Sequence, residues 1–153
     1  MIEPNKFGSD AAINARINQE DPWVMYLIVN ETLNMGVGKV AAQCGHAVGM
    51  ILNEYYRLIV KYSSNLYEDD SYNIEIKKVD DTEYWLKNSF RKIVKRADLK
   101  EWEKLKAIPD HYCFVVQDAG LTEVDQGSET VMVFWPMLKS QTPKEIHKLQ
   151  LLK

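Results

Sequence analysis

Residues 25–51 read MYLIVNETLNMGVGKVAAQCGHAVGMI, and this stretch decides the fold. Its first five residues form an unbroken apolar run, which is typical of a strand covered on both faces. Gly36 and Gly38 then predict a tight turn, because glycine accepts backbone conformations and close contacts that other residues resist. The residues that follow are mostly small or apolar, so a helix formed by them can lie close to a sheet. The stretch therefore predicts a buried strand, a glycine-rich turn and a helix.

Three polar side chains occur at helical spacing within this stretch. Lys39, Gln43 and His46 stand at positions i, i+4 and i+7, so they share one helical face. They lie near the expected helix N-terminus, where unpaired N–H groups and the helix dipole favour anions. A Gly-x-Gly-Lys sequence alone, however, is neither a Walker loop nor a dinucleotide fingerprint, and Lys and Gln are ordinary surface residues. The triplet is either a functional face or ordinary helix surface.

The composition is that of one ordinary globular domain. The chain has 153 residues, 46% of them hydrophobic and 27% charged, so it can bury a core. The formal net charge of −3 gives no general attraction to nucleic acid, and an RNA-binding face requires local clustering of cations. The cysteines, Cys44 and Cys113, lack metal-ligand spacing and suit a reducing compartment. With no long apolar run and no signal-peptide core, we expect a cytoplasmic protein without membrane contact. The cysteines and histidines show no metal-ligand spacing, so we expect no metal, and no cofactor is expected either.

The rest of the chain predicts further strands and helices. Residues 1–22 are polar and mixed, and we expect a flexible N-terminal arm ahead of a domain at residues 23–153. Residues 63–82 are polar and acidic and predict an insertion, with a short strand or hook at Ile74 and Ile76. Other strands are expected at residues 91–95, 112–116 and 130–135, and other helices at residues 83–88, at 98–107 and from 142 onward. This order predicts an α/β fold, a three-layer sandwich whose mixed four-stranded sheet has helices on both faces.

Two loops follow strands at the positions where α/β proteins usually bind ligands, namely residues 30–39 and 117–129. Asp118 comes directly after an apolar strand, where partial desolvation can tune a carboxylate for proton transfer. The alternative is that Asp118 closes the strand in an Asx turn.

Two motifs together resemble the type 2 peptidyl-tRNA hydrolases of archaea and eukaryotes. The first is MGVGKVAAQCGHA at residues 35–47, and the second is VVQDAGLTEVDQGSETV at residues 115–131. The closing EIHKLQLLK resembles the C-terminal helix and tail of the same family. The resemblance implies a single α/β domain, usually a homodimer, that hydrolyses the ester bond between peptide and tRNA in peptidyl-tRNA and releases free tRNA.

The resemblance also implies which residues form the site. Lys39 would hold a tRNA phosphate or stabilise an oxyanion, and Asp118 would orient or deprotonate water. His46 or Thr122 would complete the hydrogen-bond relay. These four residues form the expected catalytic set. The expected substrate-binding residues are Gly38, Gln43, Gln117, Gly120, Ser128, Arg91 and Lys92.

Two departures from the family pattern reduce the positive charge expected at an RNA-binding face. Val37 and Leu121 stand where family members commonly carry basic residues, and residues 68–70 add an acidic run. The basic cluster that includes Arg91 and Lys92 either compensates for these changes or forms a solvated strand edge. Peptidyl-tRNA hydrolysis is therefore the expected function. The alternative is a catalytically weak or inactive member that binds tRNA ends or a nucleotide-like ligand.

Overall fold

The predicted first strand lies at the centre of a mixed β-sheet. The computed structural model describes residues 20–64, 70–109 and 112–153, and its strands follow the order β3-β4-β1-β2-β6, with β5 pairing to the start of β1. The strands are β1 (Trp23–Asn30), β2 (Arg91–Ala97), β3 (Cys113–Gln117), β4 (Glu129–Phe134), β5 (Met137–Leu138) and β6 (Gln150–Leu151). Only β1 and β2 pair in parallel. The expectation of four strands is corrected to six, because the two-residue strands β5 and β6 add to the four that were expected.

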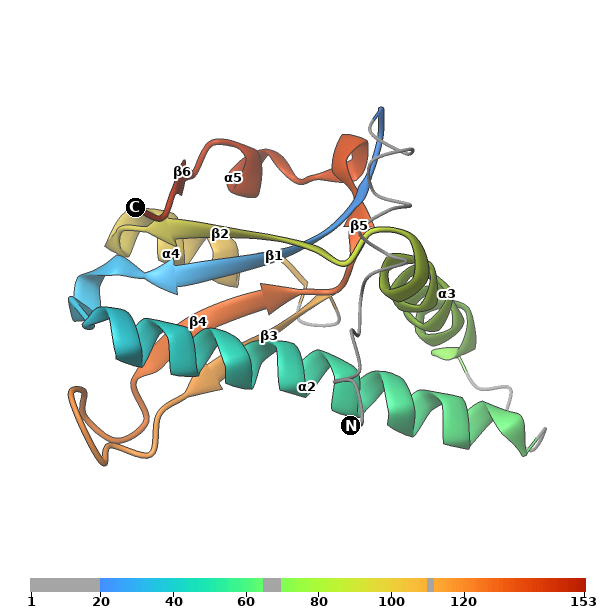
Figure 1. Cartoon of the computed structure of the whole chain (residues 1–153), viewed down its shortest axis with the longest axis horizontal. Helices are drawn as coiled ribbons and strands as arrows, with labels where there is room; N and C mark the ends of the chain where they lie inside the picture. The colour runs from blue at the N-terminus through green and yellow to red at the C-terminus, as the bar shows by residue number, and fades with distance from the viewer. Residues whose placement is uncertain (1–19, 65–69, 110–111) are drawn as a thin grey trace, which may run out of the picture.

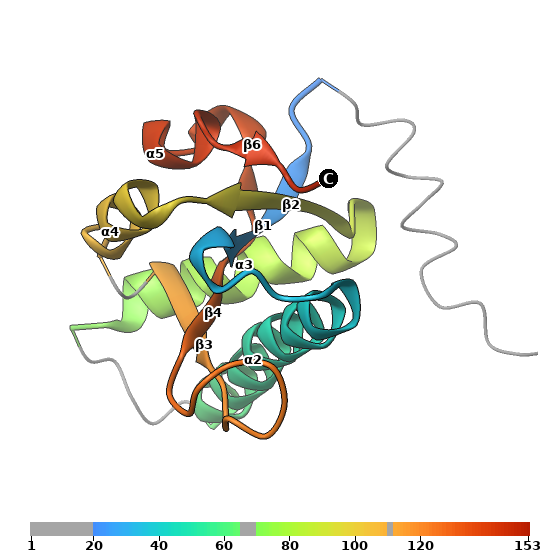
Figure 2. The same cartoon turned by 90° about the vertical axis from the view of Figure 1, so that its left-hand side faces the viewer.

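The side chains of β1 alternate between two hydrophobic cores. Met25, Leu27 and Val29 face a core that is closed by α2 (Val37–Ser63) and α3 (Tyr72–Asn88). The intervening residues face a second core, closed by α4 (Leu99–Lys106) and α5 (Lys144–His147). Helices thus cover both faces of the sheet, as Figures 1 and 2 show, and the predicted three-layer sandwich is confirmed. Among the described residues, no helix is long and apolar enough to span a membrane.

The glycine-rich turn leads directly into α2, as the sequence predicts. Gly36 is the N-cap residue, and its N–H donates to a carboxylate oxygen of Glu123 at 2.7 Å. Ala47 and Ile51 are fully buried against the sheet, and they anchor the apolar face of the helix. The bond to Glu123 joins the start of α2 to the loop after β3, which lies beside it in Figure 2.

Residues 72–88 form a helix, and this corrects the expectation of a short strand or hook at Ile74 and Ile76. The acidic composition that suggested a loop belongs to the solvated face of α3. Ion pairs at i, i+4 spacing, such as Lys77–Asp81, stabilise that face. Trp85 is fully buried and donates its ring N–H to the Arg91 carbonyl at 2.8 Å, so it anchors α3 to the start of β2.

Most of the predicted N-terminal arm lies outside the described residues, and so does most of the acidic run at residues 68–70. The last two residues before β1 are described and bound. Asp21 accepts hydrogen bonds from the Ser140 N–H at 2.8 Å and from the Ser140 hydroxyl at 2.5 Å. The Pro22 carbonyl accepts from the Lys139 N–H at 2.9 Å. The chain entering β1 is therefore held by the segment that follows β5.

Candidate active site

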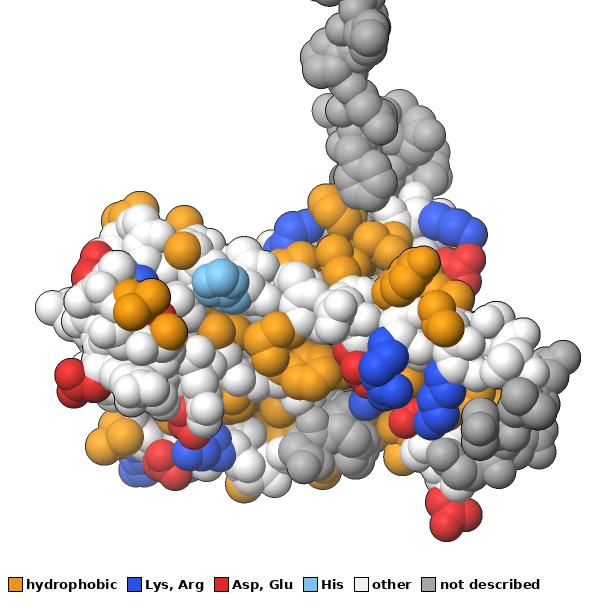
Figure 3. Space-filling model, turned by 90° about the horizontal axis from the view of Figure 1, so that it is seen from below, with side chains coloured by type: hydrophobic (Ala, Val, Ile, Leu, Met, Phe, Trp, Pro, Cys, Tyr) orange, Lys and Arg blue, Asp and Glu red, His pale blue; other side chains and the backbone are white. Residues whose placement is uncertain are grey.

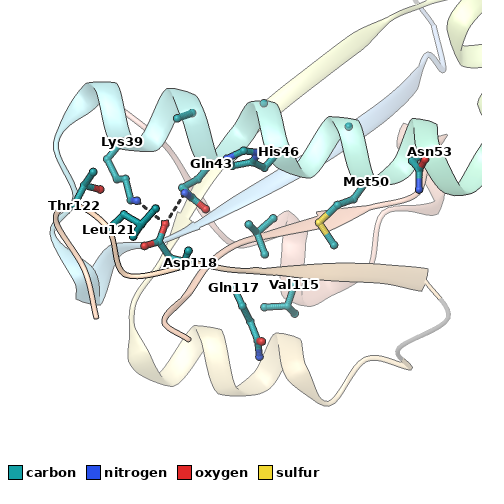
Figure 4. Close-up of a pocket in the computed structure, with 15 residues that line it drawn as sticks. Lys39, Gln43, His46, Met50, Asn53, Val115, Gln117, Asp118, Leu121 and Thr122 are labelled. Atoms are coloured by element: carbon teal, nitrogen blue, oxygen red, sulfur yellow. Dashed lines mark hydrogen bonds and ion pairs between the residues drawn. The ribbon is translucent and has the colours of Figure 1, made fainter. Parts of the chain in front are cut away.

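The two segments singled out in the sequence meet at one end of the sheet, around Asp118. The Lys39 ammonium in the first turn of α2 lies 2.5 Å from Asp118 Oδ1, and the Gln43 amide donates to the same oxygen at 2.9 Å (Figure 4). The Gly120 N–H donates to Asp118 Oδ2 at 2.7 Å. The side chains of Lys39 and Asp118 are only 11% and 6% exposed. The structure therefore brings four of the predicted residues into one hydrogen-bonded centre.

These donors set the protonation state of Asp118. The hydrogen bond from Lys39, followed by that from the Gly120 N–H, lowers the pKa of Asp118 below its ordinary value, although burial opposes the change. Asp118 is therefore ionised at neutral pH and accepts hydrogen bonds through both oxygens. A carboxylate held in this way is a good orienting group for a water molecule and a weak proton acceptor.

Thr130, which the sequence did not indicate, fixes the orientation of the Gln43 side chain in this centre. Its buried hydroxyl lies 2.7 Å from Gln43 Oε1 and 3.2 Å from the Val116 carbonyl. Because Gln43 Oε1 accepts from Thr130, the amide nitrogen of Gln43 faces Asp118. The only sequence signal was a polar residue at the start of an otherwise apolar strand.

The loop after β3 requires glycine at position 120. Gly120 has φ +77°, and a Cβ at this position would lie 2.5 Å from the backbone nitrogen of Gln126. The loop closes on itself, because the Asp118 N–H donates to the Ser128 carbonyl at 2.9 Å and the Asp118 carbonyl accepts from Gly127 at 2.8 Å. Ser128 thus contributes through its backbone to the position of Asp118.

An open pocket of about 960 Å³ lies between α2 and β3 and contains this centre. His46 and Thr122 line the pocket, and both residues are exposed. Within the described residues, neither side chain is hydrogen-bonded to Asp118. The pocket is lined by Lys39, Ala42, Gln43, Gly45, His46, Gly49, Met50, Asn53, Val115, Val116, Gln117, Asp118, Ala119, Leu121 and Thr122.

Among the other predicted substrate-binding residues, Gln117 lines the pocket, whereas Gly38, Arg91 and Lys92 do not. Gly38 lies on exposed helix surface, and the Gln117 side chain points away from the Lys39–Asp118 pair in Figure 4. Arg91 and Lys92 pair with the first residues of β1, at the end of the sheet opposite Asp118. The Lys92 ammonium lies 3.5 Å from the centroid of the Phe90 ring.

The neighbouring cations of β2 also serve the fold. The Lys95 ammonium donates to three carbonyls at the end of α5, and Arg96 pairs with Glu31 at 2.8 Å. On the face that Figure 3 shows, Lys and Arg side chains are scattered among hydrophobic and acidic ones and form no continuous basic surface. A substrate-binding role for Arg91 and Lys92 stays a prediction.

Within the described part of the chain, no group of three or more His, Cys, Asp or Glu side chains is placed to hold a metal ion.

Fold and site together define an α/β sandwich protein with a polar Lys–Asp centre in an open pocket beside a helix N-terminus. The model of the family described as peptidyl-tRNA hydrolase PTH2 matches residues 23–152, and the chain belongs to this family. A probable peptidyl-tRNA hydrolase 2 of Drosophila melanogaster is 28% identical over 152 residues, which cover 95% of this chain and 71% of the fly protein. A protein of the same name from Caenorhabditis elegans is 30% identical over 112 residues, which cover 71% of this chain and 30% of the nematode protein.

Proposed function

We propose that this protein hydrolyses the ester bond between peptide and tRNA in peptidyl-tRNA, with Lys39, His46, Asp118 and Thr122 as catalytic residues. The observation that carries the proposal is the Lys39–Asp118 pair, which Gln43 and Gly120 hold at the wall of an open pocket. Membership of the peptidyl-tRNA hydrolase PTH2 family supports the reaction.

The chemistry of each side chain suggests its part in the reaction. Asp118, ionised because its pKa is lowered, orients the attacking water. His46, exposed on the pocket wall, is the nitrogen base that takes the proton from that water. The Lys39 ammonium has three donors, one of which binds Asp118, so another stabilises the oxyanion that forms on the ester carbonyl. The Thr122 hydroxyl lines the same pocket and completes the relay.

The test is release of tRNA from peptidyl-tRNA by purified protein in single-turnover reactions. We expect Asp118→Asn to lower the rate by about 100-fold or more, because the amide keeps the shape but loses the negative charge that orients water. Asp125→Asn is the matched control, since it makes the same chemical change in an exposed residue of the same loop, and it should retain activity. No release above background by the wild-type protein would reject the proposal.

A reaction with added chelator tests the prediction that no metal is required. Full activity in chelator is the expected result. Loss of activity in chelator would overturn this part of the proposal and would call for a metal supplied with the substrate.

One observation favours the alternative of a binding protein without turnover. Val37 and Leu121, at positions where the family commonly has cations, are 88% and 86% exposed on the rim of the site. Single-turnover cleavage separates the two functions, because a binding protein would retain tRNA without cutting the ester.

A homodimer and a cytoplasmic location remain predictions. The large apolar side chains at the end of β4, Phe134 and Trp135, are buried in the core of a single chain and offer no surface for a dimer contact. Light scattering at micromolar concentration measures the mass in solution, and a monomer mass would reject the dimer.

A further inference from the structure

β3 is an edge strand whose outward backbone groups lie along the pocket. Within the described residues β3 pairs only with β4, and the Trp135 N–H donates to the Tyr112 carbonyl at 3.1 Å. Alternate residues of an antiparallel strand face its partner, so Phe114 and Val116 bond toward β4. Val115 lies between Phe114 and Val116, so its backbone N–H and C=O point away from β4. Val115 also lines the pocket.

The opposite wall of the pocket is formed by a face of α2 with little side-chain bulk. Ala42, Gly45 and Gly49 recur at helical spacing along this wall, so room remains between the helix and the edge of β3. The pocket continues from the Lys39–Asp118 pair along α2 as far as Asn53, as Figure 4 shows. We call this continuation, between Asp118 and Asn53, the peptide groove.

The charges of the lining residues indicate which half of the substrate enters the peptide groove. Apart from His46, Lys39 and Asp118 are the lining residues with charged side chains, and they neutralise each other at 2.5 Å. A strand of RNA carries one phosphate per nucleotide, and proteins bind it with cations and with aromatic rings on which bases stack. Among the residues that the structure describes, no Phe, Tyr or Trp lines this pocket. An uncharged polypeptide backbone suits the peptide groove, whereas the tRNA backbone does not.

We propose that the peptide groove binds the peptide half of the substrate as a strand added to the edge of β3. This inference rests on the proposed function, which places the ester at the Lys39–Asp118 pair. Because β3 runs toward Asp118 and the peptide ends at the ester, the added strand is parallel to β3. The Val115 N–H donates to one peptide carbonyl, and the Val115 carbonyl accepts from one peptide N–H.

The position of Val115 fixes where the peptide is held. Val115 is three residues before Asp118, which corresponds to about 10 Å along a strand. The paired peptide residues are therefore about three positions from the ester. Hydrogen bonds to a main chain depend on no particular side chain, so this mode of binding accepts peptides of many sequences.

The first test compares Val115→Pro with Val115→Ala. Proline lacks the N–H and is tolerated on an edge strand where that N–H points away from the ladder, while alanine keeps it. The substrates are an N-acetyl-aminoacyl-tRNA and a hexapeptidyl-tRNA made of Ala and Ser. We expect Val115→Pro to raise KM about 3- to 10-fold for the hexapeptidyl substrate alone, the effect of one hydrogen bond. Val115→Ala keeps the N–H, so it should raise the KM for the hexapeptidyl substrate less than Val115→Pro does.

A melting curve shows whether Val115→Pro is folded. A folded variant with an unchanged KM for the long substrate, or with equal losses on both substrates, would overturn the proposal. If the variant does not fold, the wild-type protein is tested with hexapeptidyl-tRNAs that carry one N-methyl group. Methylation about three residues from the ester should raise KM, and methylation at the peptide N-terminus should not. Equal effects at the two positions would overturn the proposal.

Addition of an unlabelled Ala-Ser hexapeptide to isotope-labelled protein, followed through the backbone amide NMR signals of the protein, separates this inference from the proposed function. A shift of the Val115 signal in a protein without hydrolytic activity would support the peptide groove while the proposed function fails. Hydrolysis without a KM advantage for the longer peptide would reject the groove while the function stands. A dimer that Val115→Pro converts to monomer would also reject it, because a second copy of the chain would then occupy the edge of β3.

Discussion

Leu121 offers a direct test of how the candidate site meets tRNA. Its side chain is 86% exposed, so it does not pack against α2, and an arginine can replace it without disturbing the core. The nearest acidic neighbour along the loop, Glu123, accepts the Gly36 N–H at the start of α2. Leu121→Arg therefore adds a solvated positive charge on the rim, next to the pocket that holds the Lys39–Asp118 pair.

The expected magnitude follows from counterion release. A cation that neutralises one phosphate steepens the plot of log affinity against log salt by about 0.9 on a duplex and about 0.7 on a single strand. Raising the salt concentration from 50 to 200 mM should therefore weaken tRNA binding by Leu121→Arg roughly threefold more than it weakens tRNA binding by the wild-type protein. Leu121→Arg should bind tRNA more tightly at low salt, and the advantage should shrink by that factor at the higher concentration. Turnover at saturating substrate should change little, because the Lys39–Asp118 geometry is untouched.

The assay is tRNA affinity at several salt concentrations for a charge series at one position. Leu121→Gln is the matched control for polarity and should keep the wild-type slope, while Leu121→Glu should bind more weakly. Melting curves establish that each variant is folded. An unchanged slope in folded Leu121→Arg would show that this position does not face the RNA, and the reasoning would be refuted.

Three further predictions concern the centre itself. The lowered pKa of Asp118 means that its stabilising contribution is complete above the unfolded-state pKa and is lost as the pH falls through the lowered one. The difference in melting temperature between wild type and Asp118→Asn should therefore be constant above about pH 5 and shrink below about pH 4; a widening gap in acid would contradict this. Thr130→Val leaves the Gln43 carbonyl without its hydrogen-bond donor. It should lower the free energy of unfolding, measured with denaturant, by about 1–3 kcal/mol and should also lower kcat. Thr130→Ser keeps the hydroxyl and should keep the wild-type stability and kcat. Gly120→Ala should lower the free energy of unfolding more than Gly127→Ala does. Both glycines have positive φ, but only at position 120 would a Cβ meet the backbone. Equal losses would show that the left-handed backbone strain, about 1–2 kcal/mol, accounts for the whole effect.

The sequence predicted those parts of the fold whose local pattern matches their final environment. β1 is an unbroken apolar run because both of its faces are buried. α2 begins within the glycine pair, with Gly36 as its N-cap and Gly38 in its first turn. The helix expected at residues 98–107 is confirmed as α4, and its start is fixed locally by a capping box in which Asp98 and Glu101 make both hydrogen bonds. The Lys39, Gln43 and Asp118 cluster was expected from two motifs, and the hydrogen bonds join them.

The parts that the sequence missed depend on distant partners. α3 has a polar, acidic sequence, and it is held by tertiary burial of Trp85 rather than by a strong local pattern. β6 exists only because its two residues pair with β2, and β5 because it pairs with the start of β1. Thr130 is 87 residues from Gln43, so nothing in the local sequence of either residue indicates their contact.

The substrate proposed for this site joins a highly charged half to an uncharged half, and under this proposal the two halves meet different parts of the pocket and its rim. The Lys39–Asp118 pair stands at the junction, with the neutral peptide groove on the side toward Asn53. On the other side lie the start of α2 and the rim with Val37 and Leu121, where the helix N-terminus favours phosphate but added cations are absent. Under this proposal, the peptide half contributes a larger share of substrate affinity than it would in a variant with a basic rim, such as Leu121→Arg. Peptide length then changes binding in the peptide groove, whereas salt concentration changes tRNA binding at the rim.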